Sequence, residues 1–121
     1  MAPNVRAAIA YTAGRLLTGS QQPSVYDYST SQHRNMSGDV GANNVNVYDY
    51  ESSCHMTGDG SGGKFSLYHY GVNNHISLEV KAPGHFEGYD YASGRHFNGT
   101  VNGNNVSFYD YEDGQYYNYS L

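Results

Sequence analysis

The chain has 121 residues, of which 14% are charged and 15% aromatic, and its formal net charge is −5. Low charge combined with many aromatic residues argues against a disordered chain, and the acidic balance argues against binding to the phosphate backbone of nucleic acids. The single cysteine, Cys54, excludes an internal disulfide framework and a multi-cysteine zinc site. The length suits one domain that spans residues 1–121.

The first twenty residues make a poor signal peptide, because their apolar stretch is short, rich in alanine and closed by Arg15. No run approaches the ~20 apolar residues that a membrane-spanning helix needs. We therefore expect a cytoplasmic protein without a transmembrane segment.

Residues 4–17 are predicted to form the one helix of the chain. Asn4 is a candidate N-cap, the segment is rich in alanine and leucine, and Gly19 stands where a helix is expected to stop. Between Arg6 and Arg15 this helix carries no charge on any side. A helix that is apolar all round is usually buried all round, so we expect it to lie inside the rest of the fold.

After the helix, one short phrase occurs five times over residues 24–121, with the first tyrosines of successive copies 20 to 22 residues apart. The copies are Val25–Tyr28, Val47–Tyr50, Leu67–Tyr70, Gly88–Tyr91 and Phe108–Tyr111. Five positions after the last tyrosine of each copy stands His33, His55, His75, His96 or Tyr116. A fixed period of about 21 residues is typical of a repeat architecture.

Each copy is predicted to be a β-hairpin. The pair Asp113-Gly114 is a strong signal for a two-residue hairpin turn, and a turn there pairs Tyr111 with Tyr116 and Asp110 with Tyr117. The period of two residues along a strand then sorts the side chains by face. One face is apolar in all five copies and is the predicted core, whereas the other collects the ten repeat tyrosines and four histidines.

The links between hairpins are short and rich in turn residues, which favours an up-and-down antiparallel meander of about ten short strands. Closing the sheet removes its two exposed edges, and a closed barrel of ten strands has a radius of roughly 10 Å. A helix with its side chains fits inside that radius. We expect a mostly β protein: a shallow closed barrel of five hairpins around the N-terminal helix. Gly38, Gly58 and Gly99 are expected to relieve crowding against that helix.

This arrangement of five hairpins resembles the β-flower fold, a bacterial family of shallow, pseudo-symmetric barrels. The resemblance covers residues 24–121 and lies in the repeat architecture. Its layout of a barrel around a helix is similar to that of Tubby-like C-terminal domains, which implies proximity to membrane lipids by analogy. Fold analogy alone does not establish function.

Acidic residues of the repeat fall on the apolar face near the hairpin tips, where they would ring one mouth of the barrel: Asp27, Asp49, Asp90 and Asp110, with His69 in the third copy. The structural interpretation is that the helix N-terminus and Arg6 face this ring, with Arg34 as a cross-strand partner of Asp27. The alternative is a cation or small-ligand site. Carboxylates on alternate strands stand about 10 Å apart, which is too far to chelate one small ion without leaning inward.

The four histidines are expected to pack against tyrosines across each hairpin, pairing Tyr28 with His33 and so on. Equivalent histidines stand roughly 10 Å apart, so a shared metal is not expected. A joint pH response near neutrality stays open.

The tyrosine belt is the remaining feature: Tyr26, Tyr28, Tyr48, Tyr50, Tyr68, Tyr70, Tyr89, Tyr91, Tyr109 and Tyr111. Cross-strand packing explains such tyrosines as scaffold, but exposed aromatic patches also mark interaction sites. Tyrosine suits stacking on sugars, membrane interfaces and protein contacts alike, including contact with a second copy of the chain.

No catalytic signature accompanies the belt. Cys54 and His55 are adjacent on a strand and therefore point to opposite faces. The sequence predicts a non-enzymatic recognition or scaffold module without a cofactor or metal, whose partner is a small molecule, lipid head group, glycan or protein. The alternatives are a membrane-proximal lipid-binding barrel, opposed by the acidic charge, and a carbohydrate-binding repeat module like the aromatic hairpin arrays that bind choline.

Overall fold

The computed structural model describes residues 1–121 and confirms the predicted class: a closed antiparallel barrel of ten strands with one N-terminal helix. The helix α1 spans Pro3–Thr18. The strands are β1 (Ser24–Asp27), β2 (Gln32–Val40), β3 (Asn44–Asp49), β4 (Cys54–Ser61), β5 (Lys64–His69), β6 (Asn74–Lys81), β7 (His85–Asp90), β8 (Arg95–Asn102), β9 (Asn105–Asp110) and β10 (Gln115–Ser120). Each strand pairs with its neighbours in sequence, and β1 closes the barrel against β10.

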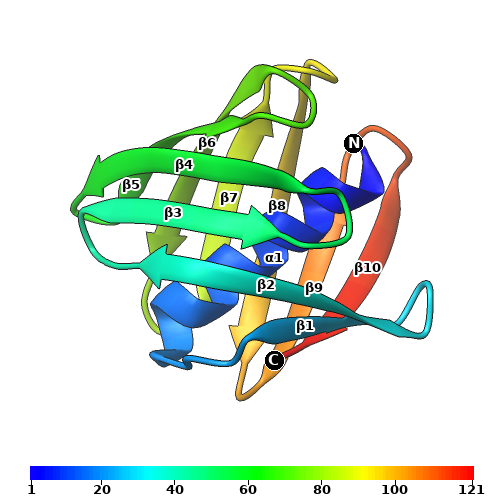
Figure 1. Cartoon of the computed structure of the whole chain (residues 1–121), viewed down its shortest axis with the longest axis horizontal. Helices are drawn as coiled ribbons and strands as arrows, with labels where there is room; N and C mark the ends of the chain where they lie inside the picture. Colours follow the sequence, from blue (N-terminus) through cyan, green and yellow to red (C-terminus); the bar gives the residue numbers. More distant parts are fainter.

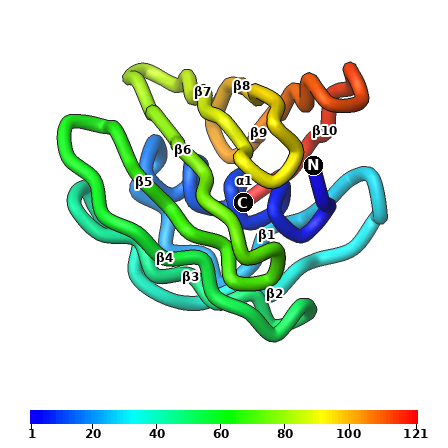
Figure 2. The backbone as a smooth tube through the Cα atoms, turned by 90° about the horizontal axis from the view of Figure 1, so that it is seen from above, coloured from blue at the N-terminus to red at the C-terminus, as the bar shows by residue number.

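The helix lies inside the ring of strands (Figures 1 and 2). Every residue from Val5 to Gly14 is buried, as the apolar run of the sequence predicts. Gly19 ends the helix in the left-handed conformation, with its N–H bonded to the carbonyl of Arg15 at 2.9 Å. The start differs from the prediction, because Pro3 occupies the first turn and Ala2, not Asn4, holds the N-cap position. With 16 residues, α1 does not reach the length and apolar character that a bilayer-spanning helix requires.

The predicted faces are correct, but the predicted hairpin register is wrong by two residues. Tyr116 pairs with Tyr109 rather than Tyr111, and Gln115 pairs with Asp110. The tips are four-residue loops, in which only the last residue has a positive φ: 67° at Gly114 and 53° at Ser53, for example. A two-residue type I′ turn needs positive φ at both central residues. Because the slip is an even number of residues, every side chain stays on its predicted face.

The core lies between the helix and the inner face of the barrel, and strand residues such as Val47, Leu67, Ile76 and Phe108 are almost fully buried in it. At the seam between β10 and β1, the side chain of Leu121 reaches the helix at Gly14, where a Cβ would lie 2.4 Å from Leu121 Cδ1. A side chain at position 14 would therefore have to displace the end of the Leu121 side chain.

Glycines on the inner face have a different role from the predicted one. A Cβ on Gly38, Gly58 or Gly99 would lie 1.9 to 2.2 Å from a backbone carbonyl oxygen of the neighbouring strand, not against the helix. These glycines pair with Val47, Leu67 and Phe108 of the next hairpin. Between β6 and β7 the order is reversed, because Leu78 pairs with Gly88. Each junction between these hairpins thus combines one glycine with one large apolar residue at close backbone approach.

Candidate functional site

The acidic ring is buried at the hairpin-tip mouth, and each member closes its own tip loop. A side-chain acceptor at the end of the first strand receives the backbone N–H two residues later, the geometry of an Asx turn. The pairs are Asp27 with Ser29 (2.9 Å), Asp49 with Glu51 (3.0 Å), His69 with Gly71 (3.0 Å), Asp90 with Ala92 (3.1 Å) and Asp110 with Glu112 (2.9 Å). This repeated hydrogen bond explains the ring without a bound cation.

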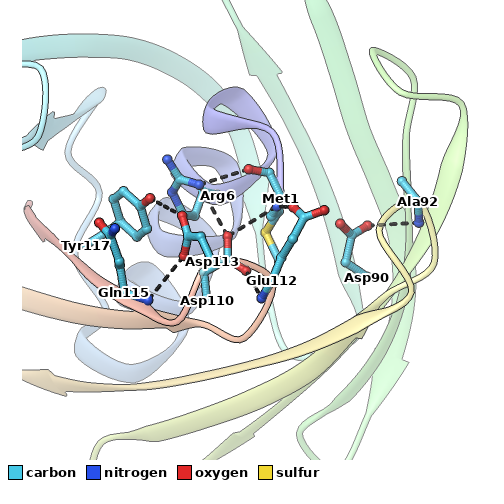
Figure 3. Close-up of polar contacts among 9 residues, drawn as sticks. All are labelled: Met1, Arg6, Asp90, Ala92, Asp110, Glu112, Asp113, Gln115 and Tyr117. Carbon is cyan, nitrogen blue, oxygen red and sulfur yellow. Dashed lines mark hydrogen bonds and ion pairs between the residues drawn. The ribbon is translucent and has the colours of Figure 1, made fainter.

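The helix N-terminus faces this ring, as expected (Figure 3). The guanidinium Nη1 of Arg6 lies 3.3 Å from Asp110 Oδ2 and donates to the carbonyl of Met1 at 2.9 Å, and the Met1 amine lies 3.3 Å from the same carboxylate. The Arg6 guanidinium also stacks on the ring of Tyr117, 3.5 Å from its centroid. Helix and barrel are therefore joined by ion pairs at this mouth.

The expected partnership of Arg34 with Asp27 is wrong. With the corrected register Arg34 lies opposite Val25, and its guanidinium reaches the next hairpin, 3.4 Å from Asp49 and 3.6 Å from Glu51. Asp27 instead accepts both the N–H and the hydroxyl of Ser29. Its cross-strand neighbour is Tyr119, whose buried phenol has its pKa raised to about 12 by burial and then by the Asp27 carboxylate.

His69 replaces aspartate in the ring by offering a ring nitrogen as the acceptor. Burial lowers the pKa of His69, an effect that the nearby carboxylates of Asp49 and Asp90 oppose. A neutral imidazole has one acceptor nitrogen, and in His69 this Nδ1 receives the N–H of Gly71. The fold therefore favours the neutral ring.

Sequence reasoning missed that Cys54 stands near His69. Both lie within 3 Å of the point where a Cβ on Gly71 would sit, and Ser52 Oγ lies 3.1 Å from the Cys54 sulfur. Because the acceptor nitrogen of His69 is occupied by Gly71, the ring has no free nitrogen to take the thiol proton. No group of three or more His, Cys, Asp or Glu side chains is placed to hold a metal ion.

On the outer face, the first tyrosine of each copy is half-buried between two other rings. Tyr48, for example, packs edge to face against Tyr50 and His55, with ring centroids 4.9 and 4.7 Å away. The pattern recurs for Tyr26, Tyr68, Tyr89 and Tyr109, with Tyr116 in place of histidine in the last copy. The histidines thus pair across the hairpin with the first tyrosine, not with the second as expected.

The second tyrosines stand at the tips, with exposed fractions from 48% at Tyr111 to 57% at Tyr50. Their backbones join neighbouring hairpins: the amide of Tyr70 donates to the carbonyl of His55 at 2.9 Å, and that of Tyr91 to His75 at 3.1 Å. Two of the phenols are also held in place, by Ser37 at 3.0 Å from Tyr50 and by Asn98 at 2.9 Å from Tyr111. The exposed rings therefore stand on a fixed backbone.

A groove of about 920 Å³ crosses the outer face of β5 to β8. It brings together members of the predicted tyrosine and histidine surface, namely Tyr89, His96 and Tyr111, with residues that the sequence does not identify as candidate binding residues: Lys64, Ser77, Glu79, Glu87, Arg95 and Asn98. Its volume is in the range of sites for small ligands. The remaining tyrosines and histidines of the belt lie outside it.

Comparisons with protein-family models, with curated proteins and with solved structures find no match to this chain. The geometry is therefore the basis for assigning a role to the surface.

Proposed function

We propose that this protein is a non-enzymatic recognition module that binds its ligand through the outer aromatic surface of the barrel. The observation that carries the proposal is the contrast between the two candidate surfaces. The acidic mouth uses its side chains in loop closure and ion pairs, whereas tyrosines at every hairpin tip remain about half exposed. Exposed aromatic surface on a rigid scaffold is typical of interaction sites.

The exposed rings have the properties of a preorganised contact surface. The tip tyrosines are anchored through their amides, and the half-buried first tyrosines support them from below. Because these rings are already ordered, a ligand that stacks on them loses little conformational entropy on the protein side.

The test compares wild type with the double variant Tyr91→Ser/Tyr111→Ser, which removes two tip rings and leaves the supporting tyrosines in place. Neutral oligosaccharides, phosphocholine and short acidic and basic peptides serve as probes in calorimetric titrations. The proposal expects at least one class to bind wild type and to lose affinity in the variant. Absence of binding by every class, or equal binding by the two proteins, would contradict it.

A lipid-binding barrel is the second candidate, because five tip tyrosines surround one mouth and tyrosine favours membrane interfaces. The acidic loop residues Glu51, Glu112 and Asp113 oppose anionic lipid at the same tips. Flotation with vesicles of neutral and of anionic phospholipid decides this: flotation that is lost in the double variant supports the lipid role, and its absence with both vesicles rejects it.

We also propose that the protein is cytoplasmic and that it is related to the β-flower-type bacterial barrels. The proposal includes self-association of the protein through the same tyrosines. Sedimentation of the wild type and of the double variant shows whether these rings hold two copies of the chain together.

A further inference from the structure

We infer that the groove over β5 to β8 is a binding site for a neutral saccharide. The inference rests on the proposed function and adds the place and the ligand class. Three properties of the groove carry it: its arrangement of polar side chains, its charge balance and its fixed aromatic wall.

The polar side chains form two parallel rows across the strands. Strand pairing places Ser77, Tyr89 and His96 side by side in one row. The adjacent row runs from Lys64 through Glu79 and Glu87 to Asn98. Neighbouring strands are about 4.8 Å apart, so each row offers hydrogen-bonding groups at regular intervals along the width of the groove.

These side chains are suited to hydrogen-bond the row of hydroxyl groups that a saccharide presents. A carboxylate accepts two hydrogen bonds side by side, while amide and guanidinium groups present paired donors. Adjacent hydroxyls of a pyranose ring donate and accept at comparable spacing. Glu87 and Asn98 stand opposite each other at the β8 end of the second row, where a carboxylate and an amide lie side by side on neighbouring strands.

The groove carries no net charge of its own. Its two acids, Glu79 and Glu87, are matched by two bases, Lys64 and Arg95. Lys81 lies beside both acids, 3.1 Å from Glu87 and 3.9 Å from Glu79. With Lys81 counted, two acids face three bases, and each acid lies next to a base. A strongly acidic or strongly basic ligand therefore meets charges of both signs here, whereas an uncharged ligand rich in hydroxyls meets no such repulsion.

Tyr111 forms the aromatic wall. Its phenol accepts a hydrogen bond from Asn98 Nδ2 at 2.9 Å, which directs the ring over β8, and 48% of its surface stays exposed. A fixed, exposed tyrosine ring offers a flat apolar surface with a polar edge, the form that the C–H face of a sugar ring stacks upon.

Calorimetric titration of the full chain tests the inference, with maltopentaose, cellopentaose and chitopentaose as the probes. The expected result is that at least one binds wild type and that Tyr111→Ser weakens it by tenfold or more. His85→Ser is the control, because His85 is an exposed ring on β7 that lies outside the groove and away from the hairpin tips. The affinity of this variant is expected to stay within twofold of wild type.

Failure of all three oligosaccharides to bind, or equal losses in the two variants, would overturn the saccharide assignment. Phosphocholine or peptide binding that depends on the tip tyrosines would then leave the recognition role standing. Thermal unfolding of each variant checks that it folds. Should Tyr111→Ser fail to fold, Asn98→Ala replaces it, since it frees the same phenol and is expected to weaken binding at least threefold.

Discussion

His69 accepts the amide N–H of Gly71 at 3.0 Å, the bond that an aspartate makes in each of the other four hairpins. The imidazole can do this only while its Nδ1 is unprotonated. Loop closure in the third hairpin is therefore coupled to the protonation of His69, whereas a carboxyl group keeps an acceptor oxygen whether or not it is protonated.

This coupling predicts a loss of stability on acidification. The pKa of His69 is lowered in the folded state from an ordinary value of 6.5, so the unfolded chain binds a proton more readily. The contribution of the neutral His69 ring to the free energy of unfolding is complete above pH 6.5 and declines as the pH falls through the folded-state pKa of His69. Urea unfolding between pH 8 and pH 5 measures it.

In this experiment His69→Asn is expected to remove part of the acid-induced loss, because an amide oxygen closes the loop without titrating. His75→Asn, in the same hairpin but on the exposed face, is the control and is expected to keep the wild-type pH profile. Identical profiles for all three proteins would refute the coupling.

The structural role of the acidic ring predicts that Asp90→Asn is tolerated and Asp90→Ala is not. The amide oxygen of asparagine still accepts the N–H of Ala92, whereas alanine leaves that partly buried hydrogen bond unmade at a cost of about 1–2 kcal/mol. Thermal unfolding compares the two variants.

If the acidic ring is structural, millimolar Ca²⁺ or Mg²⁺ is expected to leave the midpoint of thermal unfolding of the wild type at the value measured in EDTA. A cation that bound the native state would raise that midpoint. A midpoint that rises with Ca²⁺ and no longer does so in Asp90→Asn would favour the cation site instead.

A substitution of Leu67 tests whether the inner face of the barrel is the hydrophobic core. Leu67 is fully buried between helix and sheet, so Leu67→Ala is expected to lower the free energy of unfolding by about 2–4 kcal/mol. The adjacent Ser66 is exposed on the same strand, and Ser66→Ala is expected to change it by less than about 0.5 kcal/mol. Equal effects in urea unfolding would contradict the assignment of faces.

The reversed pair Leu78 and Gly88 tests the packing between hairpins. A Cβ on Gly88 would lie 2.0 Å from the carbonyl oxygen of Ser77, so Gly88→Leu is expected to destabilise by about 2–3 kcal/mol. Adding Leu78→Gly recreates the order of the other junctions. The double-mutant cycle is expected to give a favourable coupling of about 1 kcal/mol or more, and strict additivity would show that the two positions act independently.

Much of the fold follows from local rules. The period of two residues places Val47, Leu67 and Phe108 inside and Tyr48, Tyr68 and Tyr109 outside, and a register error of two residues leaves this assignment unchanged. The uncharged run of α1 predicts its burial. The predicted register is wrong because Asp113-Gly114 has the composition of a two-residue turn. The loop geometry depends instead on the hydrogen bond that the Glu112 N–H donates to the Asp110 carboxylate, which the sequence pattern does not reveal.

The candidate site is harder to predict from the sequence than the fold. The tyrosines and histidines were identified by repetition, but the groove depends on residues such as Lys64, Glu87 and Asn98 from three different strands. Their alignment requires the pairing between hairpins as well as within them. The ion-pair partner of Arg34 is Asp49 and not the predicted Asp27 for a related reason. A register error of two residues changes which side chains meet across the strands.

The most direct test of the account is a two-dimensional amide NMR spectrum of the ¹⁵N-labelled protein during titration with the three oligosaccharides and phosphocholine. The account predicts that the amides that shift lie on the outer face, concentrated at residues 77–79, 87–89 and 95–98 and at Tyr111. Shifts confined to the acidic mouth around Asp27, Asp49 and Asp110, or no shifts with any of the four probes, would contradict it.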